Sequence, residues 1–214
     1  MQREELVKMV AALRQTGKTV DVVDDLCALC ETHDTRLGDI AKTTVVGCYE
    51  RAMKALMAYA GHEETHVLDL RSHKAEELLA QWGVTYSPDA ALENEVAKEL
   101  EAMPRLTGQD AWYPVMDKSQ CAECGKCLDF CPFGVYEMVA DRIRVMHPQN
   151  CKNNCPACAR TCPAGAIIFP KYDHSPINGG NEQEEKAVKL DSKALYGDEL
   201  RKRLQARKVS LFKS

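Results

Sequence analysis

The chain has 214 residues, of which 45% are hydrophobic and 28% charged, so it is long enough for one medium-sized domain or two small ones with their own cores. No apolar run approaches the roughly eighteen residues that cross a bilayer, and charges interrupt the first turns, so we expect neither a membrane span nor an export signal. The formal net charge is −4, with the acidic excess in residues 1–111, and no basic stripe with interleaved aromatic residues points to nucleic acid. These features are typical of a cytoplasmic protein.

Residues 1–83 alternate between helical and strand patterns. Apolar side chains three and four residues apart predict helices at residues 3–14, 53–60 and 75–82. Clusters of β-branched residues predict strands at residues 19–25, 43–48 and 66–70. Gly61 and Gly83 stand where glycine commonly ends a helix. Because parallel neighbours are joined through helices, the order predicts a small parallel-sheet α/β domain of βαβ type.

The pattern of residue types along the chain changes twice after this domain. Residues 84–111 contain prolines and a short amphipathic helix, and they are expected to form a linker. From Trp112, the pattern predicts a strand at residues 112–117, a hairpin at 135–147 and a closing strand at 166–170, with a cysteine cluster before and after the hairpin. This pseudo-repeat predicts an α+β domain at residues 112–172. Residues 173–214 are expected to be a C-terminal tail that begins as loop and finishes as a short helix.

Eleven cysteines are many for a chain of this length. Without an export signal, the reducing cytosol favours metal ligation over disulfides, and the odd number agrees, because pairing would leave one thiol over.

Eight of the cysteines fall into two similar runs. CAECGKCLDFCP, residues 121–132, reads Cys-x2-Cys-x2-Cys-x3-Cys-Pro, and CKNNCPACARTCP, residues 151–163, reads Cys-x3-Cys-x2-Cys-x3-Cys-Pro. A [4Fe–4S] cube needs four thiolates at the corners of a rough tetrahedron, and a tight loop wraps only three of them, so the fourth comes from elsewhere. With each run's last cysteine crossing over, the predicted ligands are Cys121, Cys124, Cys127 and Cys162 for one cluster, and Cys151, Cys155, Cys158 and Cys131 for the other.

Through these two runs and both cysteine-proline pairs, residues 112–172 resemble a bacterial-type two-cluster 2[4Fe–4S] ferredoxin domain. The resemblance implies a small α+β fold, two low-potential clusters and one-electron transfer. The x3 spacing that opens the second run departs from the commoner x2. Two structural zinc sites are the alternative, although triplets with a distant fourth cysteine are more typical of iron–sulfur centres.

The surroundings of the clusters are also predicted. Backbone N–H groups of Gly125, Lys126 and Asn153 are plausible donors to the sulfurs. An apolar shell that excludes water is expected from Phe133, Val135, Ile143, Val145, Ile167 and Ile168.

Three cysteines remain outside the runs. Cys27 and Cys30 follow the first predicted strand and Cys48 ends the second, so we expect all three at one edge of the sheet. With His33 they form a candidate third centre, for zinc or for a further iron–sulfur cluster. Two other interpretations stay open, namely a redox dithiol and buried structural cysteines. The pattern CALC…GCYERA is loosely similar to small electron-transfer subunits that link hydrogenases to heterodisulfide reductase-like enzymes.

Other motifs give no site. HEETH, residues 62–66, matches the zinc-protease string, but Gly61 should end the preceding helix, so the two histidines would not share a helical face. The dinucleotide and P-loop glycine patterns are absent.

The sequence therefore predicts an electron-transfer protein without a catalytic activity of its own. It would relay single electrons between donor and acceptor proteins through two [4Fe–4S] clusters, as a subunit of a larger cytoplasmic oxidoreductase. The alternative is a thiol–disulfide-type reductase that uses the N-terminal cysteines and is fed by the clusters. Low-potential clusters near solvent are oxidised readily, so an anaerobic setting is expected.

Overall fold

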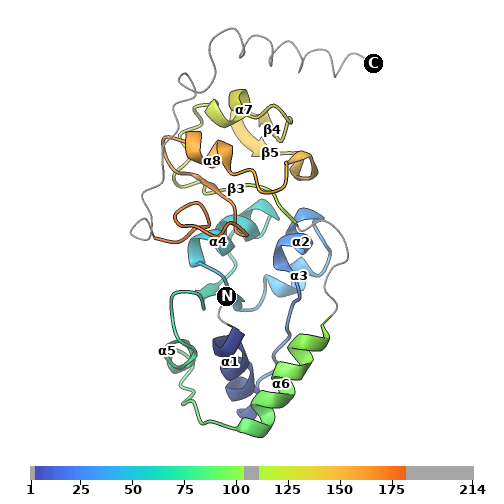
Figure 1. Ribbon diagram of the computed structural model, residues 1–214, viewed down its shortest axis with the longest axis vertical. Helices are drawn as coiled ribbons and strands as arrows, with labels where there is room; N and C mark the ends of the chain where they lie inside the picture. The colour runs from blue at the N-terminus through green and yellow to red at the C-terminus, as the bar shows by residue number, and fades with distance from the viewer. Residues whose placement is uncertain (1–2, 104–110, 182–214) are drawn as a thin grey trace.

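The computed structural model describes residues 3–103 and 111–181, which form an elongated molecule (Figure 1). In the N-terminal half, residues 3–103, the helices are α1 (Arg3–Gln15), α2 (Leu26–Glu31), α3 (Leu37–Ile40), α4 (Glu50–Tyr59), α5 (Ala75–Ala80) and α6 (Ala90–Ala102). Strand β1 (Val45–Gly47) precedes α4 in the sequence and β2 (Val67–Asp69) follows it. The two strands pair in parallel, so β1–α4–β2 is a single βαβ unit.

The strand predicted at residues 19–25 is wrong. These residues have no regular structure, and the parallel sheet has two strands rather than three. Val20 and Val22 instead pack beside α1 and α6, while the Asp25 side chain accepts the N–H of Ala28 and caps α2. β-branched residues suit any half-buried extended segment, so they indicated burial here and not pairing.

The predicted helices of the N-terminal half are confirmed, and the one expected in the linker is packed. On α6, Val96 is fully buried against Val10 and Ala11 of α1. Arg14 of α1 also pairs with Glu99 of α6 at 2.7 Å. The residues of α6 therefore belong to the packing of the N-terminal half.

In the C-terminal half, residues 111–181, the strands are those predicted. The elements are β3 (Val115–Met116), α7 (Lys126–Phe130), β4 (Tyr136–Val139), β5 (Arg142–Val145), the 3-10 helix η1 (Pro148–Asn150), α8 (Ala157–Thr161) and β6 (Ile167–Ile168). β4 and β5 form the antiparallel hairpin, and β6 closes back on β3. Each cysteine run thus ends in a short helix, α7 or α8, and is followed by a strand.

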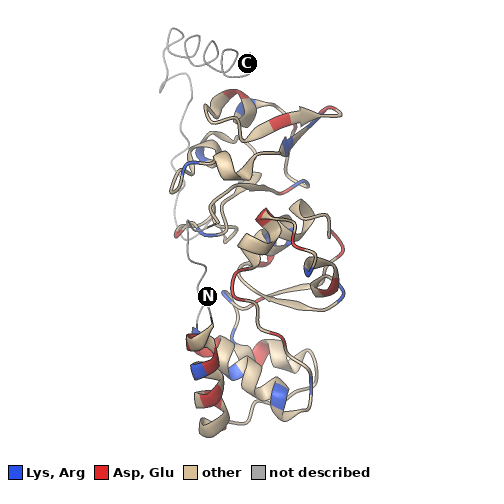
Figure 2. Ribbon diagram, turned by 90° about the vertical axis from the view of Figure 1, so that its right-hand side faces the viewer, with Lys and Arg blue, Asp and Glu red and all other residues tan. Residues whose placement is uncertain are grey.

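The two halves share a hydrophobic core. Leu29 of α2 and Leu56 of α4 pack with Val115 of β3 and Ile168 of β6 in one buried cluster. Figure 1 shows α2 and α4 lying directly against the C-terminal half, with α1, α5 and α6 at the far end. Figure 2 shows lysines, arginines, aspartates and glutamates spread along the whole length of the described chain.

The first residues of the predicted tail are packed as well. The N–H of Phe169 donates to the carbonyl of Ile177 at 2.8 Å, and Asn178 is 1% exposed. Gly180 lies so close to Tyr49 that a Cβ built there would stand 2.8 Å from the ring. Residues 182–214, and with them the helix predicted near the end, lie outside the described residues. Within the described ranges, none of the helices is long and apolar enough to cross a membrane.

Candidate metal centres

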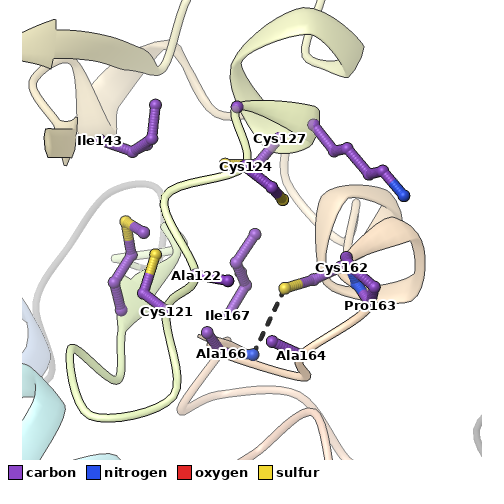
Figure 3. A pocket seen from close by; sticks show the side chains of 13 residues that line it. Cys121, Ala122, Cys124, Cys127, Ile143, Cys162, Pro163, Ala164, Ala166 and Ile167 are labelled. Atoms are coloured by element: carbon purple, nitrogen blue, oxygen red, sulfur yellow. Dashed lines mark hydrogen bonds between the residues drawn. The ribbon is translucent and has the colours of Figure 1, made fainter. Parts of the chain in front are cut away.

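Four cysteines line one pocket in the C-terminal half. They are Cys121, Cys124 and Cys127 of the first run and Cys162 of the second. The pocket has about 330 Å³ of empty space, part of it open to solvent. Figure 3 shows the four side chains around this space, with Cys162 reaching it from the far side. This is the crossed set that the spacing predicts.

The local backbone explains how one loop presents three of these thiols. Glu123 and Gly125 both have positive φ, 48° and 73°, so the loop reverses direction before α7 begins. Cys127 then lies in the first turn of α7. Cys162 comes immediately after α8, where the second run leaves its helix.

The remaining four cysteines form a second neighbourhood. Burial raises the pKa of Cys151 to about 12, and charges on Cys131 and Cys155 raise it further. Burial likewise raises the pKa of Cys158, with the charges of Cys131 and Cys151 acting in the same direction. Cys131 directly follows α7, as Cys162 follows α8. The last cysteine of the first run therefore lies near Cys151 and Cys158 of the second.

The donor set of four thiolates fits a four-iron cube. Among the residues in the described ranges, no group of three or more Cys, His, Asp or Glu side chains is arranged to hold one metal ion. A zinc ion about 2.3 Å from each thiolate would draw the sulfurs to about 4 Å from one another. Four thiolates that line one pocket also suit a cluster, in which each iron takes one of them.

Hydrogen bonds reach the sulfurs from two groups that the sequence reasoning missed. The buried hydroxyl of Tyr136 donates to Cys158 Sγ at 3.1 Å, and the N–H of Ala166 donates to Cys162 Sγ at 3.4 Å. Burial, together with the charge of Cys158, raises the pKa of Tyr136 well above its ordinary value, so the hydroxyl stays protonated. Tyr136 occupies the one buried position of β4, and no local sequence pattern distinguishes it from another core aromatic residue. The expected donors Gly125, Lys126 and Asn153 stay predictions.

The apolar shell is largely as expected. Val135, Ile143, Val145, Ile167 and Ile168 are buried, but Phe133 is 43% exposed. Phe133 lies between Pro132 and Gly134, whose positive φ of 70° turns the chain at this point.

The three N-terminal cysteines lie near the contact between the two halves. Cys27 and Cys30 are on α2, and Cys30 is fully buried in the shared core. Burial and the charge of Asp25 raise the pKa of Cys30 to about 12. Burial also raises the pKa of Cys27, with Asp25 and the nearby Cys48 adding to the effect.

His33 follows α2 with a φ of 50°, and its ring lies 5.1 Å from that of Tyr59. Within the described residues, Cys27, Cys30, His33 and Cys48 are not drawn together around one ion, so the third centre stays a prediction. The HEETH string, residues 62–66, is not helical, as expected.

Comparison with known proteins agrees with this geometry. The family model for the 4Fe-4S dicluster domain matches residues 113–163. An uncharacterized ferredoxin of Methanocaldococcus jannaschii is 44% identical over 61 residues, which cover 28% of this chain and 42% of that protein. Ferredoxin-3 of Nostoc sp. is 32% identical over 92 residues, which cover 33% of this chain and 89% of that protein.

The ferredoxin of Methanothermococcus thermolithotrophicus is 35% identical over 51 residues, covering 24% of this chain and 83% of that protein. The chain thus spans less than half the length of the first of these relatives and most of the other two. By its dicluster domain and its likeness to these proteins, the chain belongs to the ferredoxin family of iron–sulfur electron-transfer proteins.

Proposed function

We propose that the chain holds two [4Fe–4S] clusters and relays single electrons between partner proteins. The first cluster would be held by Cys121, Cys124, Cys127 and Cys162, and the second by Cys131, Cys151, Cys155 and Cys158. The observation that carries this proposal is the single pocket lined by three cysteines of one run and the last cysteine of the other. Each cluster, when bound, supplies one site that accepts and gives up one electron.

The protein's own residues give the two sites different roles. Cys124 is exposed, so a partner can approach the first set closely. In the second set, Cys131 and Cys158 are each 7% exposed, and Cys151 packs against the core shared with α2 and α4. Cys124 therefore makes the first set the expected point of electron exchange with a partner, while Cys151 brings the second set next to the N-terminal half.

We further propose that the chain is a subunit of a hetero-oligomeric cytoplasmic oxidoreductase. The N-terminal half, joined to the C-terminal half through a common core, then moves with the clusters as one body and is suited to docking. The thiol–disulfide alternative has less support, because a raised pKa leaves little thiolate on Cys27 and Cys30 near neutral pH.

Reductive titration of anaerobically purified protein tests the proposal. A low-potential donor should reduce the chain reversibly by two electrons, and a soluble acceptor should recover both. Uptake of no electrons, or a bleaching that reoxidation does not restore, contradicts electron transfer. The same titration after alkylation of accessible thiols serves as a control, since cluster-bound cysteines are protected.

A further inference from the structure

Arg51, in the first turn of α4, reaches from the N-terminal half into two loops of the C-terminal half. Its Nε donates to Asp117 Oδ2 at 2.7 Å. Its Nη2 donates to Gln120 Oε1 at 2.9 Å and to the carbonyl oxygen of Gly165 at 2.6 Å. The side chain is 25% exposed and that of Asp117 is 15% exposed, so the ion pair is largely shielded from water. One guanidinium therefore ties together loops that are far apart in the sequence.

These two loops carry one cysteine from each run. Residues 117–120 directly precede Cys121, and Gly165 follows Cys162 by three positions. The carbonyl of Asp117 accepts the N–H of Cys121 at 3.1 Å, and the N–H of Asp117 donates to the carbonyl of Ala166 at 2.8 Å.

Ala166 in turn donates its N–H to Cys162 Sγ at 3.4 Å. A continuous chain of hydrogen bonds thus runs from Cys121 through Asp117 and Ala166 to Cys162. Arg51 supports the middle of this chain from both loops, because it contacts Asp117 on one side and Gly165, the neighbour of Ala166, on the other.

A crossed ligand set makes this link necessary. The two runs are aligned by the pairing of β3 with β6, which is only two residue pairs long, Val115 with Ile168 and Met116 with Ile167. Beyond so short a ladder, the hydrogen bond from Asp117 to Ala166 and the contacts of Arg51 join the two loops. The planar fork of an arginine, with several donors in fixed directions, holds two acceptor groups at a set spacing in a way that a lysine does not.

We propose that Arg51 is a positioning residue for the first cluster, which holds Cys121 and Cys162 at the spacing that a shared cluster requires. This inference rests on the crossed ligand sets of the proposed function. It makes the N-terminal half part of the housing of the first cluster. Among the described residues, Arg51 donates its hydrogen bonds to Asp117, Gln120 and Gly165 and to no cysteine of the second set, which therefore serves as an internal reference.

Full-length Arg51→Ala and Arg51→Lys, compared with the wild type, test this role. Lys54→Ala is the matched control, because Lys54 lies one turn further along α4, is 58% exposed and pairs with Glu50. Each protein is purified anaerobically, and its iron per chain is counted. Redox titration followed by electron paramagnetic resonance gives the potentials of both clusters. Incubation with a chelator gives the rate at which each cluster is lost. A Cys124→Ser variant identifies the signals of the first cluster.

In Arg51→Ala, the first cluster should be lost roughly tenfold faster or more, since charge-assisted hydrogen bonds are among the strongest in proteins. Its potential and spectrum should change, while those of the second cluster stay at wild-type values. Arg51→Lys should fall between Arg51→Ala and the wild type. If Arg51 only joined the two halves of the chain, Arg51→Ala would lower the melting temperature without affecting one cluster more than the other.

Wild-type lifetimes, potentials and spectra for both clusters in Arg51→Ala overturn the inference. Equal changes in both clusters, or the same change in Lys54→Ala, overturn it as well. If Arg51→Ala does not accumulate as folded protein, Arg51→Lys decides on the same criteria. A wild-type chain without two clusters would instead overturn the proposed function, and the inference with it.

Discussion

Replacing Tyr136 with phenylalanine should lower the reduction potential of the second cluster alone. The change deletes one hydroxyl, which is buried and donates to Cys158 Sγ at 3.1 Å, and keeps the ring that fills the core. A donor to a ligand sulfur stabilises the reduced, more negative form more than the oxidised one. Its loss therefore makes reduction harder.

The size of the shift follows from the energy of one hydrogen bond. A bond to a charged acceptor contributes about 1.5–3 kcal/mol, and we take about 1 kcal/mol as the part that differs between the two oxidation states. For a one-electron couple, about 1.4 kcal/mol corresponds to about 59 mV, so the potential should fall by about 40 mV.

Redox titration with spectroscopic detection of each cluster measures this shift. Tyr113→Phe is the control, because Tyr113 is also buried but donates its hydroxyl to the carbonyl of Cys27 and to no cluster ligand. A potential that rises in Tyr136→Phe, an equal fall in both clusters, or the same fall in Tyr113→Phe would refute the reasoning.

Three further predictions concern the ligands, the N-terminal thiols and the packing. Serine at Cys162 should alter the same cluster signal as serine at Cys121, although the two lie in different runs; agreement of Cys162→Ser with Cys158→Ser in spectra of the anaerobic variants would refute the crossing. Alkylation of Cys30 should be slow at pH 7 and accelerate as the pH rises, because its pKa of about 12 leaves little thiolate near neutrality. Peptide mass spectrometry over pH 7–10 measures this, and rapid labelling at pH 7 would contradict it. Val96→Ala should lower the free energy of unfolding by about 2 kcal/mol in a denaturant titration, whereas alanine at the exposed Val139 should cost little; equal effects would show that α6 is not packed as described.

Local patterns predicted most of the elements, because each depends on neighbours in sequence. The apolar stripe of α1 and the alternation of the β4–β5 hairpin are set within a few residues, and the cysteine spacing fixes which thiols one loop can present. The strand predicted at residues 19–25 failed for the same reason. Val20 and Val22 are half-buried, but they pack beside α1 and α6, and no local pattern tells whether such a segment meets a helix or a strand.

The contacts that join the two halves had no local signal. Leu56 and Val115 meet in one core although they are far apart in the sequence, and their apolar character alone predicts burial without naming a partner. From the sequence, Arg51 cannot be told from other charged residues on the surface of a helix. Its contacts with Asp117 and Gly165 become evident only in the folded structure. Tyr136 differs from any core aromatic residue only through the sulfur that its hydroxyl meets.

Counting iron and acid-labile sulfide per chain in anaerobically purified protein tests the central claim most directly. Two [4Fe–4S] clusters predict eight irons and eight sulfides, with a brown colour that bleaches on reduction. Colourless protein, zinc in place of iron, or four irons in a chain whose eight cysteines are intact would contradict two clusters in crossed ligand sets.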